Sequence, residues 1–510
     1  MNVVSTLDPS NGQRRQTHLR ETGDADLESL TTIAATAAAW LADLGRSGRA
    51  RLLDAIANSL EANRANLVAV ADSETGLGRA RLDTELTRSA TQFRMFADVL
   101  RDGGYLEAAI DHAADTALGP APDVRRMLVA LGPVAVFGAS NFPFAFSVAG
   151  GDTASALAAG CPVIAKGHPS HPLTSDASGE AIRQAVGELA GPDGVVAVVY
   201  GQEAGRSLVR HRAIRAAAFT GSIGAARAIQ AAIDERTDPI PFYGELSSVN
   251  PIVVLEAAAA ERGLTIAAGL FASFTGSGGQ LCTKPGLTFI PASPAGDRLV
   301  DALGEQVADA AGTVLLNERI QDAFVAGEAS LENAGARVLA RPRITATGGF
   351  TVAPVLMEVD LTELSANLTD ECFGPAMIVV RYRQVGDLDT ALEVVPPSLT
   401  GTIHTGDGDD RTIVRRLAEL LAARSGRLVF DGYPTGVRVS WAQHHGGPWP
   451  STNSLHTSVG ATAIRRFLRP LAWQGAPEWL LPEELRDGFA SIPRRVDGRL
   501  EPGQGDAATS

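Results

Sequence analysis

Cys282 is the residue whose surroundings point most directly to chemistry. It ends the segment 274–282, FTGSGGQLC, in which a run of glycine and serine comes just before the thiol. Glycines let the backbone approach a ligand closely, and a cysteine after such a turn can present a thiolate beside backbone N–H donors. The ordinary alternative for a single cysteine is a buried, inert thiol in a loop. The segment therefore indicates a nucleophile only if other parts of the chain support it.

Three further polar residues could complete a nucleophilic site. Asn141 lies in GASNFPF (138–144), Glu245 in FYGELSSVNP (242–251) and Glu371 in DECFGP (370–375). Taken singly, each residue could be a turn former or a solvated acid. Taken together, an amide could stabilise a developing oxyanion, and a partly desolvated carboxyl of raised pKa could activate water.

The elements around these segments predict how they are brought together. Apolar runs alternate with helical stretches, which is typical of βαβ units in a doubly wound parallel sheet. Such sheets bind ligands beyond the carboxyl ends of their strands. The expected strands of the first series are Val134–Phe137, Pro162–Lys166, Val195–Tyr200 and Ala216–Thr220. A second series spans about 250–430, with Leu287–Ile290, Met377–Arg381, Thr400–His404 and Arg427–Phe430 as strands.

The joint pattern resembles the aldehyde dehydrogenase superfamily over nearly the whole chain, from about Ala25 to Asp487. Longer strings narrow the resemblance to the branch of 2,5-dioxopentanoate (α-ketoglutarate semialdehyde) dehydrogenases and bacterial NADP-dependent fatty aldehyde dehydrogenases. Those strings are AKGHP (165–169), GELSSVNP (244–251), HGGPWP (445–450) and RRFLRP (465–470). The resemblance implies an α/β fold with a Rossmann-type cofactor domain, an α/β catalytic domain and a small β oligomerisation arm.

Chemistry and resemblance together assign the catalytic roles. Cys282 is expected to add to the aldehyde, and the adduct then releases hydride to the nicotinamide and becomes a thioester. The Asn141 amide and the Cys282 backbone N–H would hold the oxyanion. Glu245 would be the general base that activates water for hydrolysis of the thioester. The resemblance also implies that Glu371 binds the nicotinamide ribose and that Phe373 packs against the cofactor.

Lys166 and Gly221-Ser222 are the expected contacts to the rest of the cofactor. Lys166 ends a strand, where a cation can meet the adenosine ribose or its 2′-phosphate, although an exposed strand-end lysine is the alternative. Ser222 opens a helix that would lie beneath the pyrophosphate. Pro169 stands where relatives that prefer NAD often carry a glutamate, so no acid repels a phosphate there. NADP is therefore the expected cofactor, with NAD possible. Arg206 is more simply a solvated helix residue than a phosphate contact.

The domain boundaries follow from the same alternation. We expect a cofactor-binding domain over 24–110 and 128–245 and a catalytic domain over 246–437. An oligomerisation element would use 111–127 and 438–487, with Val124–Leu131 and Ala461–Leu471 as strands. The resemblance implies that this element forms a homodimer or homotetramer. The termini 1–23 and 488–510 are expected to be flexible.

Composition limits the partners and the compartment. The formal charge of −14 offers no basic field for nucleic acid or an anionic membrane. The uncharged stretch 127–151 is interrupted by prolines, and the N-terminus lacks a signal-peptide pattern, so we expect a cytoplasmic protein. Cys161, Cys282 and Cys372 form no C-x-x-C pair. No carboxylate or cysteine adjoins His444-His445 in the sequence, so no metal is expected.

Several alternatives remain open at this point. A CoA-acylating dehydrogenase would not need Glu245, whereas a Cys–His acyl hydrolase could use His404 or His445. A catalytically inactive structural or binding protein on this fold would not need the catalytic residues. The aldehyde is undecided between 2,5-dioxopentanoate and a medium- or long-chain fatty aldehyde, because Phe142, Phe146, Phe274 and Trp449 could line an apolar channel. A 2-oxo acid would need a cation, and Arg438 is one candidate.

Overall fold

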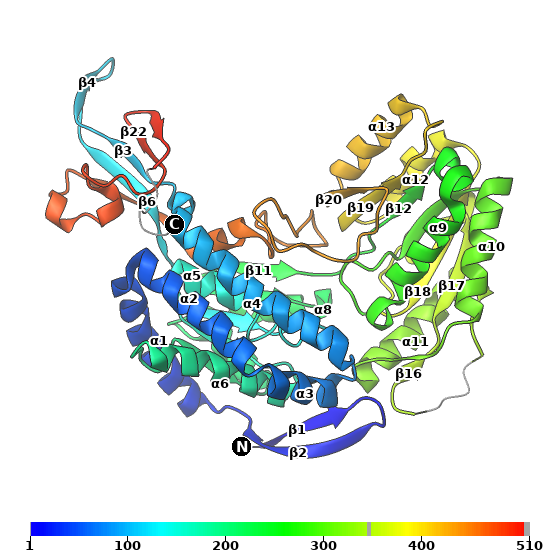
Figure 1. Ribbon diagram of the computed structural model, residues 1–510, viewed down its shortest axis with the longest axis horizontal. Coiled ribbons are helices and arrows are strands. Elements are labelled where there is room, and N and C mark those ends of the chain that lie inside the picture. Colours follow the sequence, from blue (N-terminus) through cyan, green and yellow to red (C-terminus); the bar gives the residue numbers. More distant parts are fainter. Residues whose placement is uncertain (1, 344–347, 504–510) are drawn as a thin grey trace.

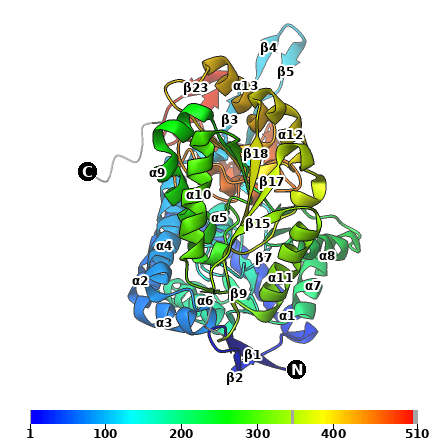
Figure 2. The same ribbon diagram turned by 90° about the vertical axis from the view of Figure 1, so that its right-hand side faces the viewer.

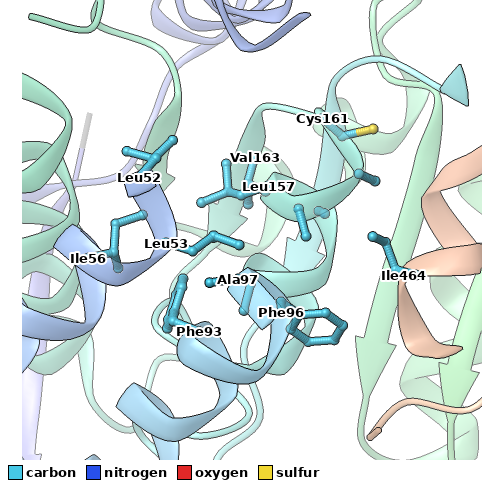
Figure 3. Packing of buried hydrophobic residues seen from close by; sticks show 14 of the residues in the cluster. Leu52, Leu53, Ile56, Phe93, Phe96, Ala97, Leu157, Cys161, Val163 and Ile464 are labelled. Carbon is cyan, nitrogen blue, oxygen red and sulfur yellow. The ribbon is translucent and has the colours of Figure 1, made fainter. Parts of the chain in front are cut away.

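A layer of N-terminal helices covers one side of the molecule in the computed structural model, which describes residues 2–343 and 348–503 (Figure 1). These helices are α1 (Asp24–Asp43), α2 (Gly45–Ala62), α3 (Arg64–Thr75) and α4 (Arg79–Asp102). Apolar side chains recur every three or four residues in α2 and α4, so each helix buries one stripe. Figure 3 shows Leu52, Leu53 and Ile56 of α2 facing Phe93 and Phe96 of α4.

The first sheet has five parallel strands in the order β11-β10-β7-β8-β9. Alternate residues of its strands belong to different cores. Val134 and Val136 face α2 and α4, whereas Ala135 and Phe137 face the side of α1, α7 and α8. Both faces are therefore buried, as expected for parallel strands. The strands are β7 (Val134–Phe137), β8 (Val163–Lys166), β9 (Val196–Val199), β10 (Ala216–Thr220) and β11 (Phe242–Glu245). The helices between them are α5 (Gly151–Ala159), α6 (Pro172–Glu188), α7 (Gln202–Arg210) and α8 (Ile223–Asp234).

The second sheet has seven strands in the order β15-β17-β18-β13-β12-β19-β20, of which only β15 pairs antiparallel among the described strands. Figure 2 shows α9 and α10 on one side of its strands and α11 and α12 on the other. The strands are β12 (Ile252–Val254), β13 (Leu287–Pro291), β15 (Arg337–Ala340), β17 (Val355–Asp360), β18 (Ala376–Tyr382), β19 (Ser398–His404) and β20 (Ser425–Phe430). The helices are α9 (Glu256–Thr275), α10 (Pro294–Ala308), α11 (Glu318–Asn333), α12 (Leu388–Val394) and α13 (Arg411–Ala422), and β14 (Thr313–Val314) pairs with β16 (Thr351–Val352).

A third sheet projects from the body as an arm, in the order β21-β6-β3-β22-β23, with the β4–β5 hairpin at its tip (Figure 1). Its strands are β3 (Ala109–Asp111), β4 (Ala114–Thr116), β5 (Gly119–Ala121), β6 (Val124–Ala130), β21 (Leu468–Gln474), β22 (Arg494–Val496) and β23 (Arg499–Glu501). The expected strand Ala461–Leu471 is wrong in its first part. Residues Ala461–Phe467 form a 3-10 helix (η6), because Ile464 and Phe467 are buried in the core and Arg466 pairs with Asp152 at 2.7 Å.

The N-terminal segment differs from expectation. Instead of being flexible, it forms the hairpin β1 (Val3–Asp8) and β2 (Gln13–Arg20) along the edge of the first domain (Figure 1). The buried Glu74 carboxylate fixes the hairpin to the domain. It accepts hydrogen bonds from the Thr6 hydroxyl at 2.6 Å and from the Thr174 backbone N–H at 2.8 Å. Strands β22 and β23 likewise lie in the C-terminal stretch expected to be flexible, and residues 504–510 lie outside the described residues.

The α/β fold class predicted from the sequence is confirmed, with two doubly covered sheets and a β arm. Among the described helices, none is long and apolar enough to cross a membrane. The Cys282 segment leaves α9 at the place where the two large sheets face each other.

Candidate active site

A sharp turn delivers Cys282 to the junction between the two large domains. After α9, the 3-10 helix η2 (Gly276–Gly279) contains Ser277 and Gly278 at φ of 54° and 65°. Gly279 has φ 66°, and a Cβ atom there would stand 2.2 Å from the Gly374 carbonyl oxygen. Glycine is therefore required at position 279 for both reasons. This close approach joins the Cys282 loop to the loop of Glu371 and Phe373.

Asn250 fixes the backbone of the cysteine loop from the opposite side. Its side-chain amide donates to the carbonyl oxygens of Cys282 at 2.9 Å and Lys284 at 3.0 Å, and its own oxygen accepts from the Thr400 backbone N–H. The residue is fully buried. Sequence reasoning missed its role, although it lies in the same string GELSSVNP as Glu245.

Cys282, His445 and Glu245 form a continuous line of contacts. The Cys282 Sγ lies 3.5 Å from His445 Nε2, and the same nitrogen lies 2.8 Å from Glu245 Oε1. The Ser458 hydroxyl donates to Glu245 Oε2 at 2.6 Å. The His445 and Glu245 side chains are only 1% and 2% exposed, so this line is closed to bulk water at its far end.

The pKa directions in this line follow from burial and charge. Burial raises the pKa of Glu245, but His445 and Ser458 outweigh burial and leave this pKa below its ordinary value. The raised pKa expected for Glu245 is therefore wrong, because that expectation lacked these two partners. Burial raises the pKa of the Cys282 thiol well above its ordinary value, and the Glu245 charge adds to the increase. The thiol is thus the stable form of Cys282, and it needs a proton acceptor to become a nucleophile.

The sequence-based argument against a metal, that no carboxylate or cysteine adjoins His445, does not hold in the folded chain. A carboxylate and a cysteine do adjoin His445, and one ligand atom from each of Glu245, Cys282 and His445 lies within 4.8 Å of the others. The short His445–Glu245 contact is the arrangement that proton transfer needs. His404, the other histidine considered, packs its buried ring 5.3 Å from Tyr433 and is not among the residues of this line.

Asn141 stands at the carboxyl end of β7 and reaches the cysteine loop. Its Nδ2 donates to the Gln280 carbonyl oxygen at 2.8 Å, two residues before Cys282. The Arg81 guanidinium in turn donates to the Asn141 carbonyl at 2.8 Å. An amide carries two N–H donors, so one remains for a ligand beside Cys282.

A cavity of about 560 Å³ opens beside Cys282 at the carboxyl ends of the parallel strands. Its lining includes most of the residues predicted for the site: Asn141, Gly221, Ser222, Cys282, Glu371 and Phe373. Ser222 caps α8, since its hydroxyl accepts from the Ala225 N–H at 3.3 Å, and the helix N-terminus can hold a pyrophosphate. A groove with a helix N-terminus, a carboxylate for ribose hydroxyls and an aromatic ring fits a dinucleotide. Ser5, Leu7 and Arg14 of the N-terminal hairpin also line it, a contribution that sequence reasoning missed.

Lys166 is not among the residues that line the cavity, although it was expected to contact the cofactor. It ends β8, but the cavity lining begins two residues later with His168, Pro169 and Ser170. Its side chain lies against Gly205 of α7, and burial lowers the pKa of the ammonium to about 8. Arg206 pairs with Glu203 at 3.6 Å on the surface of the same helix.

Glu371 and a neighbouring lysine form the wall opposite the first sheet. Burial raises the pKa of Glu371, while Ser247 and Lys284 act in the opposite direction. The buried Lys284 ammonium donates to the carbonyl oxygens of Cys372 at 3.0 Å and Ala376 at 2.8 Å. Lys284, which sequence reasoning did not single out, therefore braces the loop that carries Glu371 and Phe373.

Comparisons with known proteins identify the family of the chain. The model of the aldehyde dehydrogenase family matches residues 2–447. The chain is 44% identical over 465 residues to alpha-ketoglutaric semialdehyde dehydrogenase 2 of Azospirillum brasilense, covering 89% of this chain and 88% of the relative. It is 41% identical to alpha-ketoglutaric semialdehyde dehydrogenase of Acinetobacter baylyi, covering 89% and 87%.

Solved structures share the fold at lower identity. The structure of 3,6-anhydro-L-galactose dehydrogenase in complex with NAP has a TM-score of 0.79 at 20% identity, covering 93% of this chain and 96% of that one. The 1-pyrroline-5-carboxylate dehydrogenase from Thermus with bound NAD has a TM-score of 0.78 at 22% identity, covering 93% and 90%. With its sequence strings, its fold and its family match in agreement, the chain belongs to the aldehyde dehydrogenase family.

Proposed function

We propose that this enzyme oxidises 2,5-dioxopentanoate (α-ketoglutaric semialdehyde) to 2-oxoglutarate through a thioester on Cys282. The observation that carries the chemistry is the line of contacts from Cys282 through His445 to Glu245 beside the dinucleotide-shaped cavity. The choice of aldehyde is supported by the two relatives that share 44% and 41% of their residues with the chain.

The first chemical step needs a thiolate. The ionised Glu245 carboxylate, which accepts from His445 Nε2 at 2.8 Å and lies within 4.8 Å of the Cys282 sulfur, takes the Cys282 proton. The sulfur then bonds to the aldehyde carbon. The free N–H of the Asn141 amide and the Cys282 backbone N–H hold the resulting oxyanion, an arrangement that is most effective in a site closed to water.

The nicotinamide, when bound, accepts the hydride. In this proposal Glu371 holds the ribose, Phe373 packs against the ring, and Gly221 and Ser222 hold the pyrophosphate. The product of that step on the protein is a thioester at Cys282. The proton taken from Cys282 is released to solvent. Glu245 then takes a proton from a water molecule, the water oxygen adds to the thioester carbon, and the carbon–sulfur bond breaks to give the carboxylic acid and the Cys282 thiolate, which recovers a proton from Glu245. Coenzyme A is not required, because Glu245 provides the base.

The proposed cofactor is NADP, with NAD as the second choice. Pro169 carries no acid that would repel a 2′-phosphate. Positive charge comes from Lys166, three residues earlier in the chain, and from Arg14 and Arg319 in the cavity lining, where Arg14 lies 3.8 Å from Glu318. Lys166 is half ionised near pH 8 without ligand, and a phosphate beside it would favour the ammonium form.

The remaining parts of the proposal concern assembly and compartment. The arm presents exposed apolar side chains, including Trp479, Leu480 and Leu500, and its sheet ends in unpaired edge strands. Such edges are stabilised by pairing with another copy, so we propose a homodimer or homotetramer. The three cysteines are all free, which suits a reducing compartment such as the cytoplasm.

A second substrate class has one observation in its favour. Phe142 and Phe146 stack edge to face at 5.2 Å, and the Phe146 ring lies 6.4 Å from the His445 ring. This apolar pair suits an aliphatic aldehyde. The other aromatic residues considered do not add to it, because Phe274 is fully buried in the core and Trp449 is 53% exposed.

The test is the appearance of reduced nicotinamide absorbance with purified enzyme, without coenzyme A. Each of NADP and NAD would be combined with 2,5-dioxopentanoate, succinate semialdehyde, hexanal and a long-chain aldehyde. We expect the highest kcat/KM for NADP with 2,5-dioxopentanoate and no reduction by Cys282→Ala. A higher kcat/KM for the long-chain aldehyde would replace the proposed substrate, and an absolute need for coenzyme A would refute the hydrolytic step.

A further inference from the structure

Arg88 is a buried cation that has too few partners for its position. It lies on α4, and its guanidinium stacks on the Phe146 ring at 5.5 Å from the centroid. It donates one hydrogen bond, to the Val437 carbonyl oxygen. Its Nε and Nη2 atoms are buried without a hydrogen-bond partner within residues 2–343 and 348–503. Buried guanidinium groups are normally fully bonded, because an unsatisfied charged donor is strongly destabilising.

The position of Arg88 links it to the nucleophile. The Phe146 ring contacts both Arg88 and His445, and His445 contacts Cys282. The charge of Arg88 also lowers the pKa of Cys282, opposing burial, so the two groups are close enough to interact. Arg88 therefore lies near the reacting sulfur, packed on the same aromatic ring as His445.

Arg427 approaches the same place from the second domain. It lies on β20 and donates to the carbonyl oxygens of Pro434 and Gly436, the latter at 3.0 Å. Arg88 donates to the carbonyl oxygen of the next residue, Val437. The two guanidinium groups, one from each large domain, therefore bind the same turn. The Nε of Arg427 is also buried and without a partner in the described part of the chain. Neither arginine forms an ion pair with a described carboxylate.

The other arginines near the site are already engaged or exposed. Arg81 lies about two helical turns before Arg88 on α4. Its guanidinium is 3.8 Å from the Glu85 carboxylate and donates to the Asn141 carbonyl oxygen. Arg438, the candidate from sequence, is exposed. Arg88 and Arg427 thus have buried N–H donors near Cys282 and no ion pair in the described part of the chain, although the charges of Glu85 and Glu245 partly balance that of Arg88.

We propose that Arg88, assisted by Arg427, binds the carboxylate at the far end of the aldehyde substrate and so selects short ω-aldehydo acids over neutral aldehydes. This inference deepens the proposed function and rests on it. A guanidinium presents paired N–H donors that match the two oxygens of a carboxylate. The unbonded Nε and Nη2 of Arg88 form such a pair. The Phe142–Phe146 pair would then pack against the short methylene chain between the two ends of the substrate.

The experiment compares charged and neutral substrates in the full-length enzyme. Arg88→Met would be measured for kcat/KM with 2,5-dioxopentanoate, succinate semialdehyde and hexanal, with Arg88→Lys as the charge-preserving variant. Arg94→Met is the matched control, because Arg94 lies on the outer face of α4 and pairs with Glu61. We expect Arg88→Met to lower kcat/KM for both acids by about 10- to 100-fold more than for hexanal, the loss typical of a hydrogen bond to a charged group; the change with hexanal reports the effect of the lost charge on Cys282. Arg88→Lys should retain part of the activity.

An equal loss with all three substrates would overturn the inference, because it would mean that Arg88 acts on Cys282 or on the fold. Hexanal oxidation by the variant also reports that it is folded. If Arg88→Met does not fold, the wild-type enzyme gives the answer: glutarate should inhibit hexanal oxidation competitively, and 1,5-pentanediol should not. Equal inhibition by both compounds, or none by glutarate, would refute a carboxylate site. Failure of wild-type enzyme to oxidise 2,5-dioxopentanoate while it oxidises succinate semialdehyde faster than hexanal would refute the proposed substrate and retain the carboxylate site.

Discussion

Replacing Glu245 by glutamine separates the two halves of the proposed reaction. The glutamine side chain keeps the size of Glu245. Its oxygen can accept from His445 and its N–H can donate to the Ser458 hydroxyl oxygen, in place of the bonds of 2.8 and 2.6 Å that the carboxylate accepts in the native chain. It removes the negative charge. The fold should therefore survive, because a buried group of the same shape and polarity fills the site.

The expected magnitude differs between the two steps. Removing a general base lowers a rate by about 10²–10⁴, which is on the order of 3–5 kcal/mol in the barrier to thioester hydrolysis. The thiolate step responds to two opposing effects. Loss of the Glu245 charge lowers the pKa of Cys282, because that charge contributes to its increase, but it also removes the carboxylate that accepts the thiol proton. We expect the first step to change by less than about tenfold.

The assay is rapid mixing of enzyme, NADP and aldehyde, followed at the reduced-nicotinamide band. Glu245→Gln should give a burst close to one equivalent per active site, followed by very slow turnover. Glu188→Gln, an exposed substitution on α6, is the control and should behave as wild type. If the burst falls by the same factor as steady-state turnover, the assignment of Glu245 to hydrolysis is refuted.

Three further substitutions test other parts of the account. Asn141→Ala should lower kcat by about 10²–10³ with little change in the KM for NADP, since it removes one oxyanion donor; unchanged kcat in steady-state assays would exclude that role. Lys166→Met should raise the KM for NADP more than the KM for NAD, because only NADP carries the 2′-phosphate, and equal increases would remove Lys166 from phosphate recognition. Burial raises the pKa of the Cys161 thiol from 9.0 to about 11, so its contribution to stability is complete below pH 9 and is lost as the pH rises toward 11. Cys161→Ala should therefore reduce the fall in unfolding free energy between pH 8 and pH 11 by up to about 2–3 kcal/mol, measured by denaturant titration; an unchanged difference would contradict this assignment.

Much of the site was accessible from the sequence because its residues come at the ends of strands. Asn141, Gly221 and Glu245 each follow or end a strand of one parallel sheet, so the topology brings them to one edge. Their roles remain predictions that the experiments above test. The strand Val134–Phe137 was predicted with the observed bounds, since a fully apolar run between turn residues has few alternatives.

His445 was misread because its partners lie far away in the sequence. Glu245 is 200 residues distant, and no local spacing links the two. The signal that was available is the doublet of histidines before two glycines, in a string already linked to the family branch. A search for an acid near it in sequence was the wrong test, because the domain interface supplies the acid.

The N-terminal hairpin and Arg88 were missed for related reasons. Strand β2 carries mostly exposed polar residues, so it lacks the alternation that identifies a half-buried strand. Its docking depends on Glu74, which lies on the same buried face of α3 as Leu67 and Ala71, where an apolar residue would be expected. Arg88 likewise has the composition of an ordinary helix surface residue, and only the packing of α4 against the Phe146 segment shows that it is buried.

The central claim is that Cys282 carries the acyl group. Glu245→Gln enzyme would be mixed with NADP and 2,5-dioxopentanoate, quenched in acid and analysed by intact mass spectrometry and peptide mapping. The account predicts a mass increase of one acyl group, located on the peptide that contains Cys282 and removed by hydroxylamine. Reduction of NADP with no adduct on Cys282, or an adduct that persists in Cys282→Ala, would contradict it.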